Sequence, residues 1–350
     1  MTNHEIPTPA LLVDLDRMEA NLERMAAFFR TAPAKLRPHY KNHKCPELAH
    51  RQLHAGAIGL TCATLPEAEC LVQHGVRQVL LANEIVDPVK MRRSVELAHQ
   101  ADIIFCVDDE SVADDFARAG RNGQIPISVL VDVDIGQHRC GVPPGDPTMR
   151  LVRKVLATGL RFRGLMAYGG HLSHQLPGPE KAAAVAAALR PLRETKVRLE
   201  GEGIAVEIVS GNATGTYSLL ECAGLTEVQA GTYLLMDTAY RECCTDFDLT
   251  LTVLSTVISK HGREYAVVDA GVKAISSERG IPMVKGFDGL TLRQLNAEHG
   301  IVDLGEGSPA VSIGDKIEIW VRYSDATVNL HDRMYGVRNR NVERIFQLCG

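Results

Sequence analysis

The fold of this chain is decided by residues 57–107, which read AIGLTCATLPEAECLVQHGVRQVLLANEIVDPVKMRRSVELAHQADIIFCV. Short β-rich runs alternate in this stretch with segments of helical periodicity. A helix start is marked by Asp87 before Pro88, and the same pattern returns further along at Asp146 before Pro147. Successive β–α units of this kind predict a parallel sheet that is covered by helices.

The same alternation continues on both sides of this stretch. The β-rich runs lie near residues 36, 57, 78, 102, 127, 161, 205 and 226, and the longest helical segment between them is 179–203. Eight alternations over about 200 residues predict a (β/α)8 barrel. A doubly wound open sheet is the alternative, but no GxGxxG motif follows the first strand.

The pattern changes after Tyr240, where β-rich segments are joined by glycine and aspartate turns without a long amphipathic helix. We therefore expect a second, mainly antiparallel β domain. Its predicted extent is residues 1–13 and 241–350, and the barrel is predicted over residues 14–240. The strand TPALLVDLD at residues 8–16 precedes the first barrel helix, so it is expected to join the β domain.

Composition excludes several classes of function. The net charge is −5 and aromatic residues make up 5 % of the chain, which argues against nucleic-acid binding. No apolar run reaches the roughly 20 residues that span a bilayer. The N-terminus lacks the basic and apolar regions of a signal peptide, and the nine cysteines form no paired CxxC framework. These features predict a cytoplasmic enzyme.

The residues that follow each predicted strand are the candidates for a barrel active site. Lys41 follows the first strand, Arg139 follows the fifth, and Tyr168 ends the sixth, with His171 and His174 shortly after it.

Glycine and hydroxyl residues follow the seventh and eighth strands, where barrels commonly hold a phosphate through backbone N–H groups. The residues concerned are Ser210, Asn212, Thr214, Gly215, Thr216, Gly231 and Thr232.

A phosphate site together with a lysine at the mouth of the first strand points to a phosphorylated carbonyl cofactor. Lys41 would form a Schiff base with it. The positive charges of Lys44 and Arg37 nearby in the sequence would lower the pKa of Lys41 by repulsion. The alternative is an ordinary solvated basic loop.

These residues carry a family resemblance. The run RPHYKNHKCPELAHRQLHAGAIGLTCATLPEAE, together with IGQHRCGV, GLMAYGGHLSH, IVSGNATGTY, VQAGTYLLMD, VVDAGVKA and TVNLHDRMYGVRN, resembles the D-threonine aldolase/D-serine dehydratase family. The matching segments cover nearly the whole chain in order. The resemblance implies fold-type III pyridoxal-phosphate enzymes, in which a barrel is combined with a β domain as in alanine racemase.

The resemblance also implies roles for individual residues. Lys41 would be the Schiff-base lysine, Arg139 would lie near the phenolic oxygen of the cofactor, and Tyr168 would lie beside its pyridine ring. The Ser210–Thr216 loop and the Gly231–Thr232 turn would hold the phosphate. His174 would take the proton of the substrate β-hydroxyl. A homodimer is implied as well, because relatives complete the site with the partner's β domain.

One segment departs from the family pattern. The family usually holds a divalent metal, such as Mn, Mg or Zn, through a histidine and a cysteine or aspartate two residues on, in a segment resembling GHCDPT. Here the aspartate is present as Asp325, but Tyr323 replaces the histidine. A neutral phenol is a poor metal ligand, so the metal is in doubt.

The sequence therefore predicts a pyridoxal-phosphate aldolase that acts on D-configured β-hydroxy amino acids, small-molecule substrates, without nucleic-acid or membrane partners. A β-eliminating dehydratase for D-serine or D-threo-hydroxyaspartate is one alternative. An amino-acid racemase is another, in which Tyr323 would move the Cα proton on the face opposite Lys41. An alternative of another class is a non-catalytic regulatory protein that binds pyridoxal phosphate.

Overall fold

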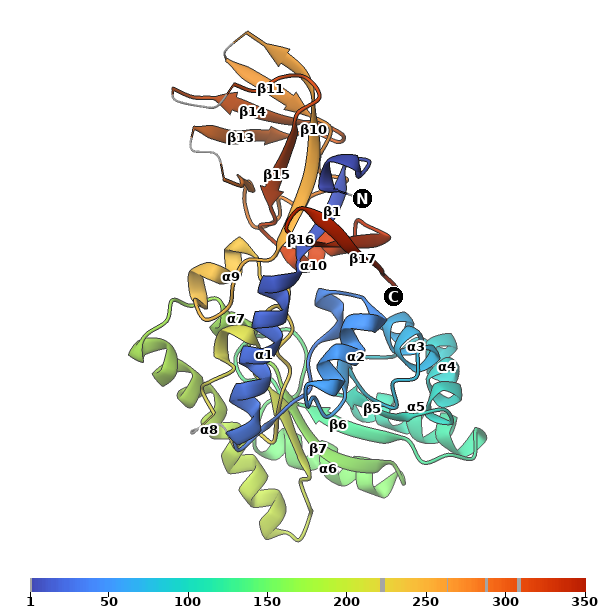
Figure 1. The fold of residues 1–350 in the computed structure, drawn as a ribbon. Coiled ribbons are helices and arrows are strands. Elements are labelled where there is room, and N and C mark those ends of the chain that lie inside the picture. The colour runs from blue at the N-terminus through green and yellow to red at the C-terminus, as the bar shows by residue number, and fades with distance from the viewer. Residues whose placement is uncertain (1, 221–223, 263, 287–288, 307–309) are drawn as a thin grey trace. The chain divides into compact units, whose positions relative to one another are not determined.

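The computed structural model describes residues 2–220, 224–262, 264–286, 289–306 and 310–350. The chain divides into two compact units, each drawn as a ribbon in Figure 1. The half-barrel unit consists of Met25–Lys41, Leu48–Gly231 and Gly350. The β unit consists of Met1–Arg24, Asn42–Glu47 and Thr232–Cys349.

The half-barrel unit is built on a sheet that has eight parallel strands in the described residues, in the order β2-β9-β8-β7-β6-β5-β4-β3. Their bounds are β2 (Lys35–Leu36), β3 (Leu60–Cys62), β4 (Gln78–Glu84), β5 (Asp102–Val107), β6 (Ser128–Asp132), β7 (Arg161–Ala167), β8 (Ile208–Gly211) and β9 (Glu227–Val228). The eight predicted strand positions are thereby confirmed.

The full (β/α)8 barrel that we expected needs one correction, because the continuous ladder is a half-barrel with edge strands β2 and β3. A few hydrogen bonds join those edges outside a continuous ladder, among them one from the N–H of Thr61 to the carbonyl of Pro38 at 2.8 Å. The N–H of Ile58 donates to the carbonyl of Leu36 (2.9 Å), and His39 and Thr61 form an isolated parallel bridge. Very short strands at both edges explain why a full ladder does not form between them.

Helices follow the strands as the alternation predicted, and Figure 1 shows them around the sheet. Their bounds are α1 (Leu15–Thr31), which begins in the β unit, α2 (Pro46–His54), α3 (Leu65–Gln73), α4 (Pro88–Ala98), α5 (Glu110–Asn122), α6 (Asp146–Ala157), α7 (Gly170–Ser173) and α8 (Pro179–Gly201), with the 3-10 turns η2 (Tyr40–Asn42) and η3 (Thr214–Thr216).

The two predicted helix starts differ in outcome. Asp87 caps α4 as expected, since its carboxylate accepts from the N–H of Lys90 at 2.8 Å. Asp146 does not cap α6. Gly145 occupies the cap position with a φ of +86°, and Asp146 begins the first turn, where it pairs with Arg198. Its negative charge still suits a helix N-terminus.

Apolar side chains from successive strands fill the interior of the half-barrel. One buried cluster joins Leu80, Ile104, Cys106, Leu130, Met166 and Ile208, and Ala82 packs against it. These residues come from β4, β5, β6, β7 and β8 in turn, so inward-pointing positions of neighbouring strands meet in one layer.

A buried ion pair joins the first strand of the half-barrel to the last. Arg37 donates from Nε and Nη2 to the two carboxylate oxygens of Glu227 at 2.9 and 3.0 Å, and both side chains are almost fully buried. Gly59 makes room for it, because a Cβ at that position would collide with the guanidinium. The bidentate geometry satisfies both charges away from water.

The β unit contains, in its described part, a nine-stranded sheet with the path β13-β14-β11-β10-β1-β16-β17, and β15 pairs with β10 and β12. The bounds are β1 (Ala10–Asp14), β10 (Leu251–His261), β11 (Tyr265–Val268), β12 (Met283–Val284), β13 (Leu290–Leu295), β14 (Gly300–Leu304), β15 (Lys316–Trp320), β16 (Arg333–Arg338) and β17 (Asn341–Gln347), with the short helices η1 (Asn3–Glu5), α9 (Thr238–Cys243) and α10 (Ser324–Val328).

Strand pairing in the β unit is mainly antiparallel, as predicted. The N-terminal strand β1 joins it by pairing antiparallel with β10 and parallel with β16, which confirms its predicted place.

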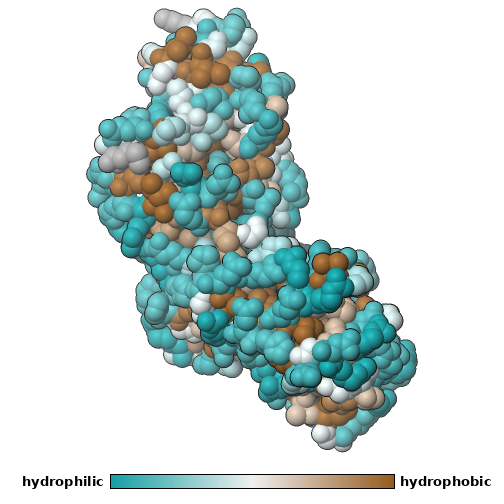
Figure 2. Space-filling view, turned by 90° about the vertical axis from the view of Figure 1, so that its right-hand side faces the viewer, coloured by the Kyte–Doolittle hydropathy of each residue, from teal (hydrophilic) through white to brown (hydrophobic). Residues whose placement is uncertain are grey.

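The face in Figure 2 is largely hydrophilic, with small groups of hydrophobic residues between polar ones. Among the described residues, no helix has the length and apolar character that crossing a bilayer requires.

We expect Glu227→Ala to lower the free energy of unfolding by about 3–5 kcal/mol, because it leaves the Arg37 guanidinium buried without a partner. The matched control is Glu202→Ala, which removes the partner of an exposed bidentate pair with Arg153. That change should cost about 1 kcal/mol or less. Urea unfolding followed by circular dichroism measures both, and equal losses would contradict the importance of burial.

Candidate active site

The half-barrel unit encloses a cavity of about 230 Å³ at the carboxyl ends of its strands. It is lined by His39, Lys41, Ala63, Ala82, Asn83, Arg139, Cys140, Met166, Tyr168 and Gln229. The structure therefore brings together three residues that the sequence placed after separate strands, Lys41, Arg139 and Tyr168.

Lys41 lies in the 3-10 turn η2 that follows β2, and it is half-buried. Its neighbour Tyr40 is fully buried, and the phenol lies 3.4 Å from Sγ of Cys70, which anchors the turn. Of the two cations expected to repel Lys41, Arg37 is paired with Glu227. Lys44 belongs to the β unit, where its ammonium donates to Oδ1 of Asn329 at 2.6 Å.

Arg139 is carried by a closed loop between β6 and α6. The carboxylate of Asp134 accepts from the N–H groups of Gly136, Gln137 and His138 at 2.9 to 3.1 Å, which fixes the turn. In the described part of the chain, no carboxylate pairs with Arg139 within 4.0 Å, and its guanidinium lies 5.2 Å from the ring centre of Tyr168. Burial raises the pKa of Asp132 and of Cys140, and the positive charge of Arg139 opposes that rise, so Arg139 contributes a positive field to the cavity.

Tyr168 follows β7 and folds back over the next turn. A Cβ on Gly170 would lie 2.6 Å from Cε1 of Tyr168 and 3.0 Å from Oε1 of Gln137, so only glycine allows this approach. The N–H of Gly170 donates to the same Gln137 oxygen at 2.9 Å. The loops after β6 and β7 are therefore locked together on one side of the cavity.

The Ser210–Thr216 loop begins at the end of β8 and is tied both to the cavity and to itself. Oγ of Ser210 accepts from the amide of Gln229, a cavity-lining residue, at 2.9 Å. Asn212 has a φ of +56° and donates to the carbonyl of Thr216 at 2.8 Å, and the hydroxyl of Thr216 accepts from the N–H of Ala213 at 3.1 Å. The side chains of Asn212 and Thr216 therefore shape the loop.

The remaining predicted phosphate residues occupy two places. Thr214 and Gly215 form the 3-10 turn η3 within the loop. Gly231 is the last residue of this segment of the half-barrel unit, and Thr232 is the first residue of the following segment of the β unit.

His174 ends the short helix α7 and is half-buried, but it does not line the cavity that contains Lys41. The helix packs against η3 at close range, because a Cβ on Gly215 would collide with the carbonyl of Ser173. His171 lies on the exposed side of the same helix, with Nε2 3.6 Å from where a Cβ on Gly136 would be.

Family models and individual relatives match almost the whole chain. The model described as alanine racemase, N-terminal domain, matches residues 13–239, and the one described as putative serine dehydratase domain matches residues 250–337. A D-threonine aldolase from Arthrobacter sp. is 36 % identical over 98 % of this chain and 92 % of its own length. A 3-hydroxy-D-aspartate aldolase from Paracoccus denitrificans (strain Pd 1222) is 33 % identical over 99 % and 92 %.

The chain belongs to the D-threonine aldolase/D-serine dehydratase family. The crystal structure of D-threonine aldolase from Filomicrobium marinum superimposes with a TM-score of 0.95 at 36 % identity, covering 99 % of this chain and 95 % of that one. D-threo-3-hydroxyaspartate dehydratase from Delftia sp. HT23 gives a TM-score of 0.88 at 28 % identity, with coverage of 99 % and 98 %. The predicted alanine-racemase-like fold is thereby confirmed.

The segment that resembles the metal-binding motif of this family has a different environment here. The amide nitrogen of Asn42 donates to Oδ1 of Asp325 and to Oγ of Ser324, both at 2.8 Å. The guanidinium of Arg279 lies 5.0 Å from the ring centre of Tyr323. A divalent cation needs electron-pair donors. Here Oδ1 of Asp325 already accepts from the Asn42 amide, and Tyr323 is a neutral phenol beside a positive charge, although the buried oxygen of Asn42 has no hydrogen-bond donor among the described residues. These residues fit a divalent metal less well than a histidine paired with a carboxylate would.

A buried carboxylate anchors the same segment within the β unit. Asp237 caps α9 and accepts from the N–H of Tyr240 and from both the N–H and the hydroxyl of Ser324, at 2.6 to 2.8 Å. Burial raises the pKa of Asp237 to about 6, although these three hydrogen bonds favour the ionised form. The segment around Asp325 is thus held by hydrogen bonds to protein groups.

Sequence reasoning missed a carboxyl pair behind the cavity. Asp132, the last residue of β6, is 3 % exposed, and burial, followed by the charge and hydrogen bond of Glu84, raises its pKa to about 8. Oε1 of Glu84 is enclosed without a donor among the described residues. Burial and the neighbouring negative charge both disfavour a second charge here, so they favour the protonated form of Asp132.

The cavity also contains two polar residues that received no role from the sequence, His39 and Gln229. Gln229 stands directly after β9 and His39 stands three residues after β2, so the rule that located Lys41 also reaches them. Glu84 and Asp132 are each the last residue of a strand, and the sequence carries no sign that they lie beside one another.

We expect Asp132→Asn to flatten the dependence of stability on pH. The pKa of this carboxyl rises from 3.8 to about 8 on folding, so between those values the native state binds one more proton than the unfolded state. The free energy of unfolding of the wild type therefore falls as pH rises through that window, by up to about 1.4 kcal/mol per pH unit from this group. Thermal unfolding across the window measures this, and identical slopes would contradict the assignment.

Proposed function

We propose that this protein is a pyridoxal-phosphate-dependent lyase that cleaves, or in reverse forms, the Cα–Cβ bond of D-configured β-hydroxy amino acids. One observation carries the proposal: Lys41 and Arg139 line a single cavity at the strand ends of a chain that belongs to this family. The D configuration and the aldol reaction are supported by the two aldolases that are 36 % and 33 % identical over nearly the full length.

The cavity residues fit pyridoxal phosphate by their chemistry. Lys41 supplies an amine that can bond the cofactor aldehyde, Arg139 supplies a cation without a carboxylate partner within 4.0 Å in the described residues, and Tyr168 supplies an aromatic ring. The Ser210–Thr216 loop and the Gly231–Thr232 turn would bind the phosphate. When bound, pyridoxal phosphate draws off the electron pair that bond cleavage leaves at Cα.

The chain's own residues then have separate tasks. Lys41 would hold the cofactor through its side-chain amine, which can bond a carbonyl group. Arg139 holds negative charge in place, and Tyr168 limits the movement of bound groups on one side. His174 lies outside the lining of the Lys41 cavity, so its task rests on the family: it would accept the proton of the β-hydroxyl while the Cα–Cβ bond breaks, for which a neutral imidazole is suited. The products would be an aldehyde and glycine or another small amino acid, and the proton lost from the β-hydroxyl is balanced by one gained at Cα.

Dehydration is the second candidate, because a D-threo-3-hydroxyaspartate dehydratase from Delftia sp. (strain HT23) is 31 % identical over 339 residues. Expulsion of hydroxide from Cβ is helped by a Lewis acid on that oxygen. Tyr323 and Asp325 fit a divalent metal less well than a histidine paired with a carboxylate would, and aldol cleavage needs only a base. The residues therefore favour the aldolase.

Three further expectations follow from the family. The protein would form a homodimer in which the partner's β unit completes the site. It would be cytoplasmic, and its substrates would be small amino acids.

Incubation with D-threonine should release glycine and acetaldehyde in equal amounts, and the rate should be unchanged after treatment with EDTA. L-Threonine under the same conditions is the control for configuration and should not react. Chromatography with an aldehyde assay identifies the products. Ammonia and 2-oxobutanoate would instead establish dehydration, and loss of activity with EDTA would contradict the reading of Asp325.

Lys41→Ala should remove covalent cofactor attachment and lower kcat by about 100- to 10,000-fold, because both the bond and a proton-transfer group are lost. Borohydride reduction followed by peptide mass spectrometry locates the attached cofactor. Lys44→Ala is the matched control within the same lysine pair and should keep the label on the peptide that contains Lys41. A label that persists in Lys41→Ala would refute this role.

A further inference from the structure

A buried lysine on α8 binds the turn that carries His174. The side chain of Lys181 is 4 % exposed, and its ammonium donates to the carbonyl of Ser173 at 3.2 Å and to that of Gln175 at 3.0 Å. These two residues flank His174 on either side. The buried ammonium of Lys181 therefore hydrogen bonds the backbone immediately before and immediately after His174.

The same turn is fixed from the other side by the Ser210–Thr216 loop. The carbonyl of Ser173 lies so close to Gly215 that any side chain there would collide with it. Ser173 is thus held between Lys181 on α8 and η3, and Figure 1 places α7 and α8 next to each other in the same unit. Displacing this carbonyl would move His174 and the loop together.

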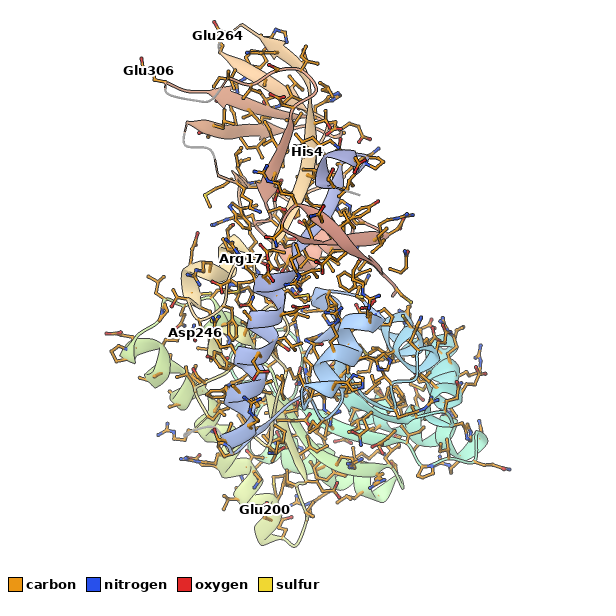
Figure 3. The ribbon with its side chains drawn as sticks, in the orientation of Figure 1. His4, Arg17, Glu200, Asp246, Glu264 and Glu306 are labelled. Atoms are coloured by element: carbon orange, nitrogen blue, oxygen red, sulfur yellow. The ribbon has the colours of Figure 1, made fainter. Side chains whose placement is uncertain are left out.

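Burial makes this lysine unusual on its helix. Removing an ammonium from water is costly, and lysine side chains are rarely fully buried unless they are paired or hydrogen bonded. Lys196, further along α8, instead has an ion pair with Glu200 at 2.9 Å near the surface, and Figure 3 labels Glu200 on this helix. Of these two lysines on α8, the buried one is therefore the one whose ammonium bonds the turn around His174.

We propose that Lys181 is a positioning residue that holds His174, and with it Gly215, in the arrangement the reaction requires. The inference rests on the proposed function, in which His174 accepts the β-hydroxyl proton. Lys181 does not exchange a proton with the substrate. It acts through the two carbonyls, because a proton acceptor that is misplaced by about 1 Å loses roughly a hundredfold in rate.

The decisive experiment is a double-mutant cycle on the enzyme loaded with pyridoxal phosphate. Lys181→Met keeps the length of the side chain but removes its donors, and we expect kcat for D-threonine cleavage to fall about 10- to 100-fold, with KM changed less than about twofold. In the His174→Ala background, the same substitution should lower kcat by no more than about twofold. An equal loss in both backgrounds, or no loss in either, would overturn the proposal.

Three controls complete the test. Lys196→Met should leave kcat unchanged, and Lys181→Arg, which retains donors, should recover part of the rate. If Lys181→Met does not fold, Lys181→Arg and Lys181→Gln enter the same cycle, with the larger loss expected for glutamine. The reverse order, or equal losses for the two, would overturn the proposal.

A readout that does not depend on turnover separates this proposal from the proposed function. Diethyl pyrocarbonate acylates accessible histidines, and peptide mass spectrometry measures the rate at His174. We expect that rate to change at least threefold in Lys181→Met, with no change at His261, which belongs to the β unit. If the wild type does not cleave D-threonine, the proposed function fails, yet this result still decides whether Lys181 positions His174. An unchanged rate would mean that it does not.

Discussion

The ion pair between Arg37 and Glu227 is the constraint on which the cavity depends, because it joins the first and last strands of the half-barrel. Strand β2 has only two residues, and the ion pair adds to the backbone hydrogen bonds that Arg37 and His39 donate to Val228 and Ala230. This strand leads directly into His39 and Lys41, while β9 leads into Gln229. The buried bidentate pair therefore fixes the position of the chain that carries Lys41 relative to the chain that carries Gln229, and both residues line the cavity.

Beyond that pair, the cavity is shaped mainly by close backbone approaches. Gly170 allows the Tyr168 ring to fold over its own turn, and Gly215 allows η3 to contact the carbonyl of Ser173. The Arg139 loop is held by a single carboxylate that accepts three N–H groups. Once their N–H and carbonyl groups are hydrogen bonded, these loops have little freedom to move. The flexible side chain of Arg139 therefore extends from a rigid backbone.

The sequence predicted the parallel strands and the gathering of Lys41, Arg139 and Tyr168, because both follow from periodicity and from the common edge of parallel strands. It also located the departure at Tyr323. It could not reveal that Asn42 bonds Asp325, since the two lie 283 positions apart. Nor could it reveal that Arg37 is already paired, or that a lysine in an alanine-rich helix points inward. Each of these depends on a long-range contact that leaves no local pattern.

The hydrogen bond from Asn42 to Asp325 also bears on how the chain next to Lys41 is held in place. The bond is made within one chain, so it forms as the chain folds. Asn42 directly follows Lys41 in the sequence. The position of the chain just after this lysine therefore depends on a segment that is 283 residues further along.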